Sequence, residues 1–189
     1  MEKILALFVV AAFALAGQAQ AEAISYSYVE LGYLETEFDS SGIDEDGDGF
    51  ELNLSANVTQ TLAVVFGYED IEFDQNIEAN LIGLGIAYHK PYSNTGDMVF
   101  GLSYVETEVE WPGDSVDDDG NEISLEVRSR TSVQTEVHFG FLRREIDDDS
   151  NSGYLFRIIS GNPQGFQFVI DYEDLDDTNG LMLGLRSTF

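Results

Sequence analysis

The sequence has no cysteine, so disulfide bonds contribute nothing to its stability. Basic residues are scarce: eight Lys and Arg stand against 36 Asp and Glu, which gives a formal net charge of −28. This imbalance argues against nucleic acid as a partner and against unaided binding to anionic surfaces. So high a charge is typical of disordered chains, but an aromatic content of 12% argues against disorder. The acidic residues must therefore gather in particular segments of a folded domain.

Long apolar runs are also missing, except at the start of the chain. Residues 4–16 are apolar and uncharged, they follow Lys3, and they precede small residues at Ala19 and Ala21. This order is typical of a secretory signal peptide, and the run is shorter than the roughly 20 residues of a membrane-spanning helix. We expect a signal peptide over residues 1–21, with cleavage after Ala23 as the alternative, and one domain over residues 22–189.

Helical spacing is absent after residue 23, and apolar and polar residues alternate with the period of two that indicates strands. Most of the candidate strands reach the roughly 9 to 11 residues with which a tilted strand crosses a membrane. Ten candidates follow one another, at residues 24–36, 49–58, 62–69, 77–88, 97–108, 122–129, 134–144, 153–160, 165–172 and 179–189.

One face of these strands is apolar and aromatic, and the other is small and polar. Leu31, Tyr33, Leu84 and Phe168 represent the apolar face. Alternation alone does not decide which face points outward, because a soluble barrel of the lipocalin type would hide the apolar face inside. The connections between strands decide it.

The connections alternate between two kinds. The odd ones, residues 37–48, 69–76, 106–121, 145–152 and 171–178, hold 26 of the 36 acidic residues, whereas the even ones hold none and are mostly tight. Alternate connections of an up-and-down barrel lie at opposite ends, and long loops outside with short turns in the periplasm are the outer-membrane arrangement. The pattern therefore favours an apolar face turned toward lipid.

The chain ends on alternating apolar residues from Leu181 to a terminal Phe189. Together with the signal peptide and the alternation, this end resembles the small outer-membrane barrel families, such as the OmpA transmembrane domain and OmpX-like proteins. Gly184 and Phe189 match the C-terminal signal of such barrels, and Ser187 departs from it. The resemblance covers residues 22–189 and implies a membrane-embedded barrel recognised by the barrel assembly machinery, without fixing a function.

We therefore predict an all-β fold: a closed antiparallel up-and-down transmembrane β-barrel of ten strands, with eight as the alternative count. Lipid offers no partners to backbone N–H and C=O groups, so the sheet must close. The expected location is the outer membrane of a Gram-negative bacterium, with both termini periplasmic and with membrane lipid and lipopolysaccharide as partners. The oligomeric state stays open.

A candidate metal site lies in the first acidic connection. Asp44, Asp46 and Asp48, with Gly49 next, have the spacing of the first half of an EF-hand loop. The closing acid of that motif would fall at Ser55, inside a candidate strand, so only a weak Ca²⁺ site is predicted. A solvated acidic loop is the alternative, and no other cofactor is expected.

The polar face carries four arginines and several acids. Their expected role is a network of ion pairs in a filled interior, and a selectivity constriction is the alternative. His138 is the histidine expected inside, with His89 in a turn, and no catalytic arrangement is recognisable, so we expect no enzyme. We predict an envelope-structural or surface-interaction role, with a narrow, porin-like passive channel as the alternative. The charged set is Glu30, Glu51, Glu126, Glu136, Arg128, Arg144, Arg157 and Arg186.

Overall fold

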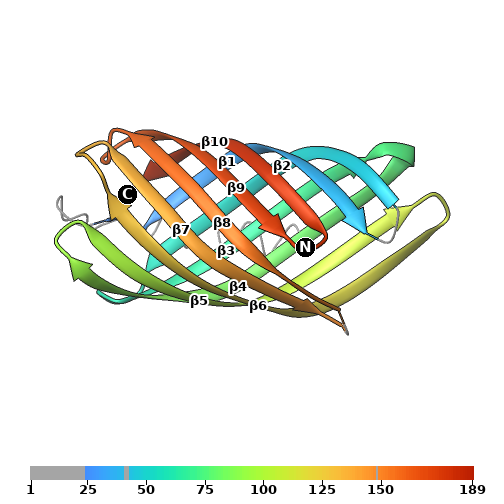
Figure 1. Ribbon diagram of the computed structural model, residues 1–189, viewed down its shortest axis with the longest axis horizontal. Coiled ribbons are helices and arrows are strands. Elements are labelled where there is room, and N and C mark those ends of the chain that lie inside the picture. Colours follow the sequence, from blue (N-terminus) through green and yellow to red (C-terminus); the bar gives the residue numbers. More distant parts are fainter. Residues whose placement is uncertain (1–23, 41–42, 148) are drawn as a thin grey trace.

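The computed structural model describes residues 24–40, 43–147 and 149–189, and in these the chain forms ten strands and one short 3₁₀ helix (Figure 1). The expected signal peptide lies outside the described residues. The ten-strand prediction is confirmed, and the alternative of eight strands is wrong. The elements are β1 (Tyr28–Ser40), β2 (Ile43–Asn57), β3 (Leu62–Phe73), η1 (Asp74–Asn76), β4 (Ile77–Ser93), β5 (Gly96–Trp111), β6 (Asp114–Arg130), β7 (Thr135–Ile146), β8 (Asp149–Gly161), β9 (Phe166–Leu175) and β10 (Thr178–Thr188).

The sheet closes on itself. Each strand pairs antiparallel with the next, and β1 pairs with β10 from Tyr28–Thr188 to Phe38–Thr178. Closure leaves no edge strand with unpaired backbone groups, which satisfies the requirement that lipid imposes on a spanning structure. No helix in the described part of the chain is long and apolar enough to span a membrane.

The strands are longer than predicted at the acidic end of the barrel. Segments 37–48 and 106–121, expected as loops, lie almost wholly in β1, β2, β5 and β6, and the turn between β5 and β6 is only residues 112–113. The acidic side chains of these segments indicated exposure to solvent. A segment exposed to solvent can still pair with its neighbour as a β-hairpin. The acidic connections are therefore extended hairpins rather than irregular loops.

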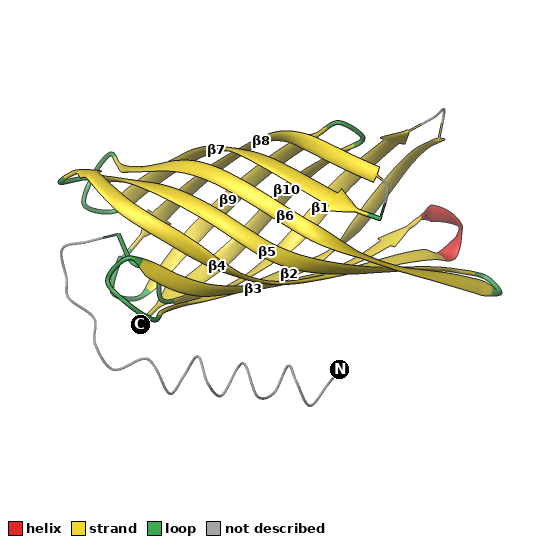
Figure 2. Cartoon of the chain, turned by 90° about the horizontal axis from the view of Figure 1, so that it is seen from below, coloured by secondary structure: helices red, strands yellow, loops and turns green. Residues whose placement is uncertain are grey.

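The β5–β6 hairpin reaches well beyond the rest of the rim (Figure 2). Its outward face continues the lipid-facing positions of β5 and β6 but carries acids instead of apolar residues. Glu106 pairs with Asp119 and Glu108 with Asp117 across the two strands. The change from apolar to acidic along the same face marks where the apolar surface of the barrel ends.

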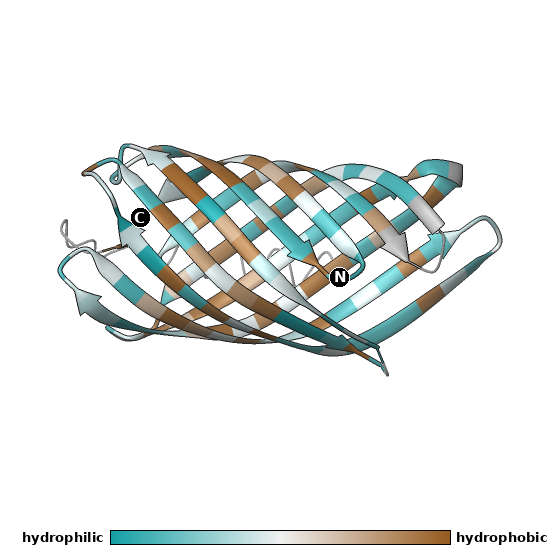
Figure 3. Ribbon diagram, viewed as in Figure 1, coloured by the Kyte–Doolittle hydropathy of each residue, from teal (hydrophilic) through white to brown (hydrophobic). Residues whose placement is uncertain are grey.

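The outer wall exposes large apolar side chains, and brown bands alternate with paler and teal ones along the strands (Figure 3). Leu31, Leu102 and Phe168 are more than 40% exposed. An exposed apolar surface of this extent marks a site of contact with lipid or with another protein. Exposed aromatic rings mark the two margins of this band. The set at the acidic end includes Tyr33, Phe50, Tyr104 and Tyr172, and the opposite set includes Tyr88 and Phe166.

Candidate functional site in the barrel lumen

The lumen wall has two unlike halves. Strands β6–β10 and β1 carry charged side chains that pair with one another, and we call them the ion-paired half. Strands β2–β5 carry mainly glycine, alanine and serine below their outer ends, and we call them the small-residue half. The inward side chains alternate with lipid-facing ones along every strand, so the pleat itself puts each set in the lumen.

A buried ion-pair ladder crosses from β8 through β9 and β10 to β1. Arg186 Nε donates to Glu30 Oε2 at 2.7 Å, and neither side chain is more than 2% exposed. Arg157 Nε donates to Asp171 Oδ2 at 2.7 Å, and its Nη1 lies 3.7 Å from Glu30 Oε1. One glutamate is therefore shared between two arginines, which is how a fully buried carboxylate keeps its charge compensated.

A second charged group lies on β6 and β7. Arg128 Nη2 donates to Glu136 Oε2 at 3.3 Å, and Arg128 Nε donates to His138 Nε2 at 3.2 Å. The His138 ring lies between two carboxylates, with Nδ1 3.7 Å from Glu126 Oε2 and Nε2 3.6 Å from Glu136 Oε2. With these neighbours, His138 belongs to the charge network.

Arg144 completes the set of four predicted inward arginines. Its Nε and Nη2 donate to Glu122 Oε2 at 2.9 and 2.8 Å. The prediction of an interior ion-pair network is confirmed for Arg128, Arg144, Arg157 and Arg186. Arginine suits this role because its planar fork makes several hydrogen bonds at once.

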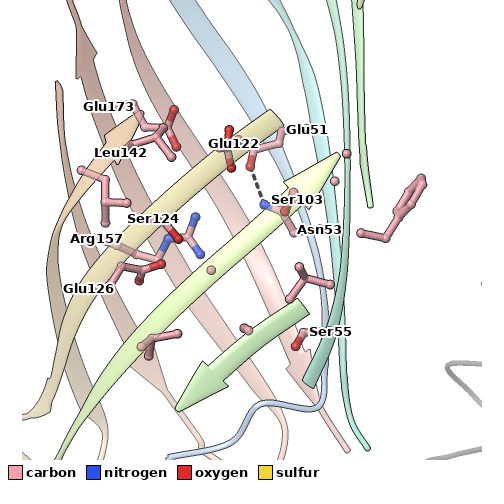
Figure 4. A pocket seen from close by; sticks show the side chains of 18 of the residues that line it. Glu51, Asn53, Ser55, Ser103, Glu122, Ser124, Glu126, Leu142, Arg157 and Glu173 are labelled. Carbon is pink, nitrogen blue, oxygen red and sulfur yellow. Dashed lines mark hydrogen bonds between the residues drawn. The ribbon is translucent and has the colours of Figure 1, made fainter. Parts of the chain in front are cut away.

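The small-residue half leaves space. A cavity of about 180 Å³ lies against it, and Figure 4 shows Asn53, Ser55 and Ser103 facing Arg157 and Glu126 across that space. Gly83 and Gly101 line it, and a Cβ added at Gly83 would meet nothing closer than Val105 Cγ1 at 3.7 Å. The lumen is therefore packed on one side and hollow on the other.

Besides Glu122, three acids line the cavity on the side of the acidic hairpins. Glu51 and Glu69 are direct cross-strand partners on β2 and β3, and Glu173 lies on β9. Asn53 donates a hydrogen bond to Glu51. Among the described residues, no salt bridge is formed by any of these three acids, whereas each of the four arginines forms at least one. Acidic side chains therefore outnumber arginines at this level of the lumen.

Residues 24–27 close the other end of the cavity. They were predicted as the start of the first strand, but β1 begins at Tyr28 and the preceding residues turn into the lumen. Tyr26 is 3% exposed, lines the cavity, and donates from its hydroxyl to Asp97 Oδ2 at 2.8 Å. The sequence did carry a signal, because Ile24 and Tyr26 alternate in the opposite phase to Val29 and Leu31, and the predicted strand ran across this break in phase.

His89 was placed in a turn by the sequence, and this is wrong. β4 continues to Ser93, so His89 lies on its inward face, 6% exposed, with its ring stacked on Tyr26 at 3.6 Å between centroids. The tight turn is shorter than predicted, because Pro91 still pairs with Asp97 of β5 and Ser93 with Gly96. His138 is therefore not the only buried histidine.

The candidate calcium ligands lie on β2. Asp46 and Asp48 are exposed alternate residues of an extended strand, opposite Glu37 and Glu35 of β1, and the Asp44 side chain is outside the described part. An EF-hand-like turn is not formed here, since the backbone is a strand. Within the side chains that are described, no group of three or more His, Asp or Glu is placed to hold a metal ion. The Ca²⁺ site stays a prediction.

Solved structures with a similar fold are outer-membrane proteins. The β domain of the Bordetella autotransporter BrkA aligns with a TM-score of 0.50 and 12% identity, over 86% of this chain and 98% of that one. Neisserial surface protein A aligns with a TM-score of 0.47 and 13% identity, over 86% and 96%, and OprG of Pseudomonas aeruginosa with 0.47 and 12%, over 86% and 95%. No protein-family model and no curated protein sequence matches the chain. The chain thus has the fold of a small outer-membrane β-barrel.

Proposed function

We propose that this chain is an integral protein of the bacterial outer membrane whose acidic hairpins act at the external surface, in an envelope-structural or surface-interaction role. The observation that carries the proposal is the asymmetry of the barrel. One end continues past the apolar band into acidic hairpins such as β5–β6, and the other ends in short turns without a carboxylate in residues 58–61, 94–95, 131–134 and 162–165. Both termini of the barrel lie at the second end, which we assign to the periplasm.

The first test is the orientation itself. Protease added to intact cells should cut within residues 37–48 and 106–121, because these hairpins face outward, and should spare residues 89–96. Mass spectrometry of the fragments gives the cut sites. Cleavage at 89–96 in intact cells would reverse the orientation and remove the proposed external role of the acids.

The partner that fits the acidic hairpins is the phosphate-bearing surface of lipopolysaccharide, bridged by divalent cations. Carboxylates and lipid phosphates repel one another, and a divalent ion coordinated by both converts this repulsion into attraction. Like charges alone would be screened by any salt over a Debye length of roughly 8 to 10 Å. Bridging therefore predicts an effect of Mg²⁺ or Ca²⁺ beyond that of NaCl at equal ionic strength.

The experiment compares two triple variants with the unchanged barrel in vesicles that contain lipopolysaccharide. One is Asp44→Asn, Asp46→Asn, Asp48→Asn, and the other is Glu106→Gln, Glu108→Gln, Glu110→Gln. Protection of the hairpins from protease is measured with Mg²⁺, with Ca²⁺ and with NaCl alone. Loss of protection in the first variant only indicates a local site, equal loss in both indicates a diffuse acidic rim, and protection unchanged in both overturns the bridging role.

A narrow passive channel is the second candidate, and the cavity beside the small-residue half favours it. The ion-pair ladder and the buried Tyr26 favour a closed lumen instead. Planar-bilayer recordings of the purified barrel separate the two, because an open channel gives steady, reproducible single-channel steps.

A further inference from the structure

The segment Ile24–Ser27 lies inside the barrel at the end with the tight turns. Ile24 and Tyr26 are 7% and 3% exposed, and they form a buried apolar cluster with Ala63, Ala87 and Val99 of β3, β4 and β5. The wall is built of small residues at this level, and the two inserted side chains fill the room that those residues leave. The segment packs as a core element although it precedes the first strand.

Tyr26 is held by polar contacts from four strands. Besides its hydrogen bond to Asp97 on β5 and its stacking on His89 of β4, its ring lies under Arg128 of β6, with 4.3 Å from Cζ to the ring centroid. Ser55 Oγ of β2 donates to the Tyr26 carbonyl oxygen at 2.6 Å. Contacts from so many directions fix the ring across the hollow side of the lumen.

This placement closes the cavity at one end. Tyr26, Ala87 and Val99 line the same cavity as Gly83, Gly101 and Ser103 farther up the wall. The ion-paired half fills its own side of the lumen with paired side chains, so the space along β2–β5 is where a passage would run. The inserted segment occupies the lower end of that passage.

Residues 24–26 take no part in the strand pairing of the wall. The ladder between β1 and β10 begins at Tyr28, and just before it the Phe189 N–H donates to the Ser27 carbonyl oxygen at 3.1 Å. Displacing residues 24–26 therefore breaks side-chain contacts and apolar burial but no strand pairing. The contacts that hold residues 24–26 in the lumen are therefore separate from those that close the sheet.

The charge of the cavity says what would pass. Its lining holds more carboxylates than arginines, including the three acids that form no salt bridge among the described residues, Glu51, Glu69 and Glu173. Rings of acidic side chains admit cations and repel anions. Small cations are therefore the class of solute that the passage fits.

We propose that the segment Ile24–Ser27 is a plug, with Tyr26 latched to Asp97, that closes a cation-conducting passage along the small-residue half of the barrel. This adds a conductive state to the closed barrel of the proposed function and does not depend on what the acidic hairpins bind.

The test is planar-bilayer recording of the barrel purified from membranes of cells that express the whole chain. The unchanged protein should be silent for most of the record, and the double variant Ile24→Ser, Tyr26→Ala should conduct in steady steps. Tyr26→Phe removes only the hydroxyl, so it should open about fivefold more often than the unchanged protein, which is the effect of losing about one buried hydrogen bond. Tyr88→Ala is the matched control, because it removes a tyrosine at the same end of the barrel but from the outer surface.

Selectivity and folding are measured on the same samples. The double variant should show a cation-selective reversal potential in a KCl gradient, and adding Glu51→Gln and Glu69→Gln should weaken that selectivity. Heat-modifiable gel migration and circular dichroism confirm that each barrel is folded, and Tyr26→Phe carries the test if the double variant fails to fold. Folded variants as silent as the unchanged protein, an unchanged protein that conducts as well as the variants, or anion selectivity would each overturn the proposal.

Discussion

The two halves of the lumen wall solve the same problem in opposite ways. The ion-paired half fills its share of the interior with long charged side chains that compensate one another, as Arg186 and Glu30 do. The small-residue half leaves a cavity and closes it with residues from outside the wall, Ile24 and Tyr26. A side chain that is part of a strand cannot leave, whereas a segment that precedes the strand can. Filling the interior of a small barrel and closing it are therefore separable tasks.

The largest effect is expected in the ion-paired half. Arg186→Met leaves Glu30, which is 0% exposed, with a hydrogen bond from Asn53 and the more distant Arg157. Removing one partner of a buried pair costs about 3 to 5 kcal/mol. Equilibrium unfolding in urea measures the loss. Arg143→Met is the control, because the Arg143–Glu145 pair is exposed and such pairs contribute about 0 to 1 kcal/mol. Equal losses would mean that the ladder is not a structural element.

The next effect compares the lipid face with the small-residue half. Leu84→Arg places a charge on the exposed apolar band, where it costs roughly 2 to 4 kcal/mol near the bilayer midplane and should block assembly. Ser103→Arg points into the cavity, which has room and carboxylates to receive it, and should be milder. The assembled fraction in the outer membrane is the measurement. Equal damage from the two would refute the assignment of faces.

A smaller effect distinguishes two glycines on the same inward face of β4. A Cβ at Gly85 would lie 2.3 Å from the Leu102 carbonyl oxygen, so Gly85→Ala should cost about 1 to 3 kcal/mol of unfolding free energy. Gly83→Ala fills open cavity and should change stability by no more than about 0.5 kcal/mol. If both variants unfold at the same urea concentration, the hollow is not where the structure places it.

The smallest effect lies in the β5–β6 hairpin, where acidic residues lie opposite acidic residues. The Asp117 carboxylate opposite Glu108 raises the pKa of Glu108 above its usual value. The folded hairpin then binds the proton more tightly than the unfolded one, so its stability rises as the pH falls through the raised pKa and is lost at higher pH.

Hydrogen exchange of the β5–β6 amides at pH 5 and at pH 7 measures this shift. Exchange should be slower at pH 5 than intrinsic rates predict, and Glu108→Gln should remove most of the difference. A pH dependence that survives in Glu108→Gln would assign the effect to other acids of the hairpin.

Much of the fold follows from residues that are close in the sequence. Leu31, Leu102 and Phe168 alternate with polar neighbours, and this pleat places them on the outer wall as predicted. The inward arginines followed from the same parity. The strand ends did not, because acidic residues such as Glu106 and Asp119 report solvent exposure and not whether the backbone stops pairing.

The candidate site divides in the same way. Asp46 and Asp48 were predicted as ligands because their spacing matches a motif that forms a turn. In the structure, pairing with β1 and β3 holds this segment in an extended conformation. Tyr26, His89 and Asp97 carry no motif. They meet because Asp97 and His89 lie diagonally across β4 and β5 while Tyr26 arrives from the start of the chain.

The sequence alone determined the period of the strands, the face that each side chain takes and the unequal charge of the two ends, since these depend on alternation and on composition along one strand. Tertiary structure decided which charges pair across the lumen, which wall stays hollow and which segment fills it. Those outcomes depend on strand number and stagger, which bring β1, β8 and β10 around Glu30 and leave Ile24 and Tyr26 a place between β3, β4 and β5.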